Sequence, residues 1–174
     1  MIRRWLGAVM LGLFAGLVAW QVTLALIPQA LMRLAVARVS AQGSAINAMT
    51  HAPLVTAKAR AIVRPSPDLL YSSCPFDLSG APLLIDAAPV AAPYWSLSVF
   101  DAQTNAVFVT NGQRSAAPVR LAVLTGGQVA PAGYRAVRVG GTTGIALIRI
   151  LIDRGAPLAA IDAARRTARC RLAQ

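Results

Sequence analysis

The chain is 174 residues long, with 56% hydrophobic residues, only 13% charged residues and a formal net charge of +11. Soluble domains average about a quarter charged residues, so this composition is typical of a membrane protein. Nucleic-acid binding needs clustered basic side chains with interleaved aromatic residues. Most basic residues of this chain are arginines, and most of these are spread along the sequence. The charge therefore favours membrane lipids, and not nucleic acid, as a partner.

The first long feature is an apolar segment from Trp5 to Ile27 without a charged residue. As a helix it is about 34 Å long, enough to cross a hydrocarbon core of about 30 Å. Cleaved signal peptides have a shorter apolar region of about 7 to 15 residues, so a retained anchor is expected. Arg3 and Arg4 precede the segment, and Arg33 and Arg38 follow it. The short N-terminal flank and two cysteines beyond the segment favour a single pass in a bacterial inner membrane, with the N-terminus cytoplasmic and the C-terminal domain periplasmic.

The chain divides into three predicted parts. Residues 1–28 form the N-terminal tail and a transmembrane helix that Pro28 closes, and 29–53 form a juxtamembrane helical connector interrupted near Gly43. Residues 54–174 form a β-rich domain. Short runs of β-branched and aromatic residues between turn residues predict seven strands there: Leu69 to Phe76, Leu83 to Ala87, Tyr94 to Phe100, Ala106 to Thr110, Val119 to Leu124, Ala136 to Val139 and Ile145 to Ile152.

The predicted fold is mainly β, an antiparallel sandwich or partial barrel, because seven short strands at this spacing are typical of those architectures. Pro157 suits the first position of a C-terminal helix. Leu158, Ile161, Ala164 and Leu172 would form its apolar face, with arginines on the other face.

No catalytic residue is predicted. His51 is the only histidine, and it would have to activate Ser72, Ser73, Ser96 or Ser98, none of which lies in a nucleophile motif. We therefore expect a surface or capping histidine.

No metal or cofactor is predicted either. The sequence has no ligand spacing of the C-x-x-C or H-x-x-x-H kind, and no phosphate loop or dinucleotide fingerprint. Glycosidase chemistry needs two carboxylates across a cleft. The aspartates that could supply them all sit at positions that resemble turns: Asp68, Asp77, Asp86 and Asp101.

The only two cysteines are Cys74 and Cys170. Both follow the apolar segment on the side interpreted as oxidising, so we expect a disulfide that joins the first β segment to the C-terminal helix. The alternative is a pair of buried free thiols.

Three motifs follow one another in the middle of the chain: P-D-L-L-Y-S from Pro67 to Ser72, D-L-S from Asp77 to Ser79 and Y-W-S-L-S-V-F-D from Tyr94 to Asp101. With these motifs the chain resembles the bacterial domain-of-unknown-function family 1254, over about Asn47 to Gln113. In larger members a second domain, numbered 1214, follows, and the pair is β-rich. The resemblance implies a short, membrane-anchored form that works beside a separately encoded 1214-type chain.

Two functions are compatible with these observations. The first is a non-enzymatic envelope component of the inner membrane that binds a partner chain through its periplasmic β domain. The second is a small-ligand-binding or hydrolytic β domain with a polar pocket formed by family-like residues: Asp68, Tyr71, Tyr94, Asp101 and Asn105. The same side chains could instead tie turns to strands, because buried polar groups need hydrogen bonds whatever their role.

Overall fold

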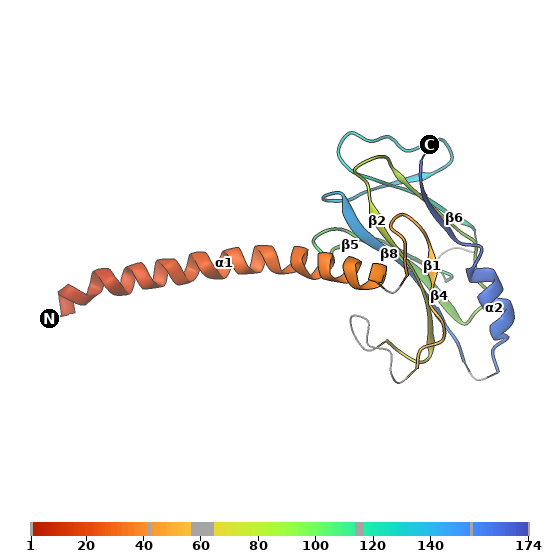
Figure 1. Cartoon of the computed structure of the whole chain (residues 1–174), viewed down its shortest axis with the longest axis horizontal. Coiled ribbons are helices and arrows are strands. Elements are labelled where there is room, and N and C mark those ends of the chain that lie inside the picture. The colour runs from red at the N-terminus through yellow and green to blue at the C-terminus, as the bar shows by residue number, and fades with distance from the viewer. Residues whose placement is uncertain (1, 42, 57–64, 114–116, 154, 174) are drawn as a thin grey trace.

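A long helix and a β sandwich make up the chain (Figure 1). The computed structural model describes residues 2–41, 43–56, 65–113, 117–153 and 155–173. Helix α1 (Ile2–Ala41) extends away from the β domain, and its residues from Trp5 to Leu26 are exposed. This helix is long and apolar enough to cross a membrane by length and composition.

Helix α1 runs through Pro28 without ending, so the predicted stop there is wrong, and the helix predicted from Gln29 is the continuation of α1 to Ala41. A proline removes one hydrogen bond from the helix but leaves its other backbone bonds in place. After Pro28 one face of the helix becomes buried, with Met32 at its centre and Ala35, Val36 and Val39 beside it. This face packs on the β domain, where α1 contacts β2 and β8. No helix resumes in the described residues between 43 and 49.

The strands form two sheets. The five-stranded sheet A has the order β1-β2-β8-β4-β5, and the four-stranded sheet B has the order β7-β6-β3-β9. The strand bounds are β1 (Thr50–His51), β2 (Leu69–Asp77), β3 (Leu83–Ala87), β4 (Tyr94–Phe100), β5 (Ala106–Asn111), β6 (Val119–Leu124), β7 (Arg135–Arg138), β8 (Thr143–Leu151) and β9 (Arg169–Leu172).

All seven predicted strands are present, and the sandwich is mainly antiparallel. The prediction fails at one pair, because β6 and β7 are parallel. Parallel neighbours need a long connection, and here residues 125–134 return over the outer face of sheet B. Ala130 and Tyr134 of this connection pack on Leu84 and Leu124.

The C-terminal helix is shorter than expected. Helix α2 spans Leu158–Arg165, and the chain then forms β9, which pairs with β3. In β9, Cys170 is buried and Arg169 and Arg171 are exposed, so the side chains alternate as in a strand half-covered by the core. The prediction that Leu172 belongs to the helix is therefore wrong.

The core lies between the two sheets. Sheet A contributes Phe76, Leu97 and Ile150 and sheet B contributes Ile85 and Leu121, all of them almost fully buried. Cys74 of β2 and Cys170 of β9 form a disulfide across this core, with their Cα atoms 6.5 Å apart. The bridge thus joins the two sheets, and its second cysteine belongs to a strand instead of the expected helix.

Reduction of this disulfide is expected to lower the melting temperature sharply. The bridge spans a sequence separation of 96 residues, and closing a loop of about 100 residues stabilises a fold by up to about 4.7 kcal/mol on the chain-entropy model. Cys170→Ser should reproduce the effect of reductant, and reductant should then have no further effect on the variant. Alkylation of two free thiols in the unreduced, denatured protein would contradict the prediction.

Candidate functional site

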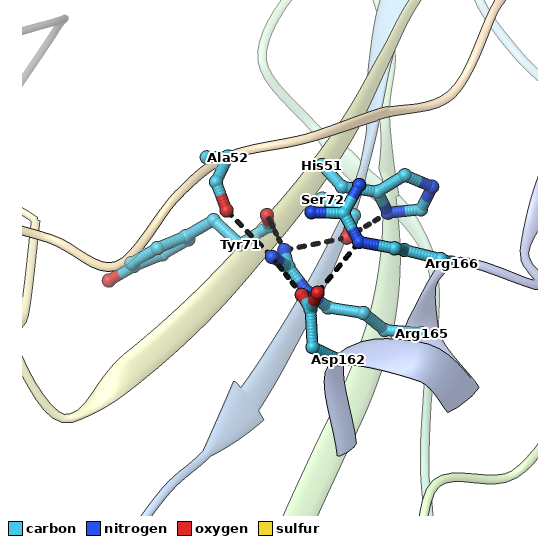
Figure 2. Close-up of polar contacts among 7 residues, drawn as sticks. All are labelled: His51, Ala52, Tyr71, Ser72, Asp162, Arg165 and Arg166. Carbon is cyan, nitrogen blue, oxygen red and sulfur yellow. Dashed lines mark hydrogen bonds and ion pairs between the residues drawn. The ribbon is translucent and has the colours of Figure 1, made fainter. Parts of the chain in front are cut away.

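A polar network of described residues centres on Arg165, the last residue of α2 (Figure 2). Its side chain is only 2% exposed. The guanidinium donates from Nη1 to the Tyr71 carbonyl oxygen at 2.7 Å and from Nη2 to the Ala52 carbonyl oxygen at 2.8 Å. It also donates from Nε to the Asp162 carboxylate at 2.6 Å. Arg165 therefore connects α2 to strand β2 and to the residue after β1.

Asp162, one turn earlier in α2, accepts from two arginines. Its second carboxylate oxygen accepts from Arg166 Nε at 2.7 Å, and Arg166 is 54% exposed whereas Arg165 is buried. The hydrogen bonds from Arg166 and Arg165 hold the pKa of Asp162 below its ordinary value. Asp162 stays ionised at neutral pH, as the buried guanidinium requires.

His51 and Ser72 are brought together beside this network. Nδ1 of His51 lies 2.8 Å from Oγ of Ser72, which Arg165 Nη1 also approaches at 3.4 Å. Partial burial lowers the pKa of His51, and the positive charges of Arg165 and Arg166 lower it further. Neutral His51 can accept a hydrogen bond from the Ser72 hydroxyl at Nδ1. His51 thus lies half-buried in the edge strand β1 and does not cap a helix.

The pair does not have the arrangement of a nucleophile and its base. Ser72 is 1% exposed, so its hydroxyl has no access to a substrate. A catalytic histidine is oriented by a third group, yet no hydrogen bond joins a described carboxylate to His51. The described contacts of Ser72 join β2 to β1 through His51 and to α2 through Arg165.

The described residues form a pocket beside this network and another elsewhere on the domain. One of about 180 Å³ is bordered by the polar residues of α2 and by apolar neighbours: Pro53, Leu54, Leu70, Leu158, Asp162, Arg165 and Arg166. Another of about 220 Å³ includes Tyr94 and is lined by residues 89, 90, 92–95, 112 and 113. In this first pocket protein acceptors occupy the Arg165 donors, and Arg166, which is more exposed, donates from Nε to Asp162.

The five residues predicted to form one polar pocket lie in separate places. Asp101 and Asn105 bond to each other at 3.0 Å just beyond the end of β4, and Asp101 also accepts the backbone N–H groups of Gln103 and Asn105. Tyr94 stands at the opposite end of that strand.

Asp68 and Tyr71 lie near the Tyr94 end of sheet A, since Leu69 and Tyr94 share the partner Leu151. The Tyr71 hydroxyl accepts from the Ser66 N–H at 3.0 Å, and Figure 2 shows its ring directed away from the Arg165 guanidinium. Asp101, Asn105 and Tyr71 therefore close turns or order loops.

Among the described residues, no three His, Cys, Asp or Glu side chains gather closely enough to hold a metal ion. The residues that sequence reasoning missed are Asp162 and Arg165. The available signal was their helical spacing, because Asp162 precedes Arg165 by three residues and Arg166 by four.

Comparison with known proteins places this fold in a family. Residues 46–172 match the family described as "Protein of unknown function (DUF1254)". The chain belongs to this family. The match extends well beyond the motifs between Asn47 and Gln113, to the end of β9. No curated protein matches the chain.

Two solved structures resemble this DUF1254 chain. The VPA0106 protein from Vibrio parahaemolyticus superposes with a TM-score of 0.59 at 13% identity, covering 83% of this chain and 37% of that one. A putative uncharacterized protein from Burkholderia cenocepacia gives a TM-score of 0.48 at 16% identity, over 82% of this chain and 39% of that one. The first likeness shows the fold. The chain spans less than half the length of either structure.

Replacing Arg165 is expected to destabilise the β domain strongly. Arg165→Leu leaves the Tyr71 and Ala52 carbonyl groups without their donor and removes one of the two arginines that donate to Asp162, so unfolding should cost about 3 kcal/mol less. Arg166→Leu is the matched control, because it removes an exposed charge from the same carboxylate and should cost under about 1 kcal/mol. Chemical denaturation of both variants measures the difference. Equal losses would contradict the assigned role of the buried guanidinium.

Acidification should weaken the fold through His51. Its pKa is lowered in the folded state, so the unfolded chain binds a proton first and stability falls as the pH drops below about 6.5. The His51 contribution is complete above that pH. Urea unfolding at about pH 7 and about pH 5.5 should show a smaller loss for His51→Gln than for the wild type. A wild-type protein that gains stability on acidification over this range would refute the assignment.

Proposed function

We propose that this chain is a non-enzymatic component of the bacterial envelope, anchored in the inner membrane by α1 and bound to a partner chain through its periplasmic β domain. The observation that carries the proposal is the exposed apolar surface of α1. Large apolar side chains such as Trp5, Leu11 and Phe14 are more than 60% exposed. Exposed apolar surface of this extent marks a protein or membrane contact.

The length of the helix supports the membrane as that contact. Nothing in the described β domain covers residues 5–27, and the helix first meets the domain after Pro28. A partner helix alone would need to cover only one face of α1, whereas the exposed side chains here surround it. Lipid tails can contact the apolar side chains on every side of such a helix.

The periplasmic side is supported by the disulfide between Cys74 and Cys170. Disulfides persist in oxidising compartments and are rare in the cytosol. Free thiols in the unreduced protein would therefore also count against this side of the membrane.

The resemblance supports a partner chain, because a 1214-type domain follows this one in larger members of the family. The Vibrio protein is matched over only 37% of its own length. We propose that the partner is a separately encoded chain of the 1214 type. The alternative of a small-ligand-binding or hydrolytic domain has less support, because Tyr94 and Asp101 lie at opposite ends of β4 and the Ser72 hydroxyl is buried.

The test is affinity purification of the full chain, tagged at its C-terminus, from detergent-extracted membranes. We expect one defined partner chain to co-purify in a fixed ratio. Gly12→Arg, which places a charge within the proposed span at a cost of about 3 kcal/mol on insertion scales, should remove the chain from the membrane fraction. A wild-type preparation that contains only this chain, at uniform size, would contradict the partner proposal. Full membrane retention of Gly12→Arg would contradict the proposal that α1 is the membrane anchor.

A further inference from the structure

The outer face of sheet B is basic where the β6–β7 connection leaves it exposed. Arg169 and Arg171 of β9 and Arg120 of β6 are exposed and point to this face, because their neighbours Cys170 and Leu121 are buried in the core. Arg138 of β7 is exposed on the same face, where it donates to the carbonyl oxygens of Gly126 and Gln128. The β6–β7 connection, residues 125–134, covers only part of this face, and all four arginines remain exposed.

One carboxylate holds two of these arginines side by side. Asp86 lies inside β3 and not at a turn as its sequence context suggests, and it pairs in register with Arg120 and with Arg169. Its oxygens lie 3.4 Å from Arg120 Nε and 3.9 Å from Arg171 Nη2, with both arginine side chains about half exposed. One carboxylate among Arg120, Arg169 and Arg171 leaves a formal charge of +2.

Tyr134 fixes the position of these guanidinium groups. Its hydroxyl donates to Asp86 at 3.0 Å and accepts from Arg171 at 3.5 Å, and the Arg120 guanidinium lies 4.3 Å from the centre of its ring. A guanidinium group that is already held in place loses less conformational entropy when it forms a bidentate pair with a carboxylate. The face is therefore prepared for an anion before any partner arrives.

We propose that this basic face, formed by Arg120, Arg138, Arg169 and Arg171, is the surface on which the β domain docks an acidic segment of its partner chain. This inference rests on the proposed function and names the contact surface for it. We choose an acidic segment because its negative charges complement the positive charges of this face. Val129, in the same β6–β7 connection that covers part of this face, is 78% exposed and adds an apolar contact.

Two other anionic occupants fit less well. Lipid head groups would lie toward the N-terminal end of α1, whereas α1 packs on sheet A and Figure 1 shows β6 and α2 on the side of the domain away from that end. Nucleic acid would need an aromatic ring free for base stacking. The Tyr134 ring is already covered by Arg120.

The test measures binding of a short, fluorescein-labelled peptide of alternating glutamate and glycine to the full chain in a neutral detergent. Arg169→Gln combined with Arg171→Gln should weaken binding about tenfold. Arg33→Gln combined with Arg135→Gln removes the same two charges from α1 and from the start of β7, and should change the affinity by less than about twofold. Melting curves establish that both double variants remain folded, and Arg169→Gln alone serves if the first pair does not.

Equal loss in both double variants, or no loss in the first, would overturn the docking surface. Tighter binding of an oligothymidylate, or of phosphatidylglycerol vesicles, with the same dependence on Arg169 and Arg171 would also overturn an acidic protein segment as the occupant. If the partner chain co-purifies equally well with the first double variant, this surface is wrong and the proposed function stands. If no chain co-purifies with the wild type but peptide binding depends on these arginines, the partner proposal fails and the anionic surface stands.

Discussion

The buried guanidinium of Arg165 joins parts of the chain that would otherwise have little to hold them together. Helix α2 is only eight residues long, and β1 is a two-residue strand at the edge of sheet A. Neither is stable as an isolated element. Removing a charge from water is costly unless every donor is paired, and Arg165 meets that requirement only when Asp162, Tyr71 and Ala52 are all in place. The last residues before β9, and with them Cys170, depend on this arrangement.

Much of the β domain could be predicted from the sequence because its strands are short runs rich in β-branched and aromatic residues that end at turn residues. The parts that could not be predicted depend on contacts between distant residues. The sequence of β9 has the pattern of the end of an arginine-rich helix, and only its pairing with β3 shows that it is a strand. Strand β8 begins at Thr143, and a Cβ atom at Gly144 would meet the Phe100 carbonyl oxygen and the Phe76 ring. No local pattern reveals such a close approach.

The candidate site was harder to predict than the fold. The family-like motifs identify polar residues such as Tyr71, Tyr94 and Asp101, but the sequence does not show which end of a strand each occupies. Pairing of β4 with β8 puts Tyr94 and Asp101 at opposite ends, so the residues cannot converge. In contrast, Ser72 and His51 meet only because β1 adds to the edge of β2. A strand of two residues carries too weak a signal to be seen in advance.

The continuity of α1 determines how the proposed anchor and the proposed docking face relate to each other. A helix that ended at Pro28 would leave the domain free to turn relative to the membrane. Because α1 continues to Ala41 and buries Met32 on the domain, the direction of the span is tied to sheet A. Sheet B then presents Arg169 and Arg171 on the opposite side of the sandwich from this contact. A partner that reaches the basic face therefore approaches without competing with α1 for the same surface, and the anchor restricts its search to one orientation of the domain.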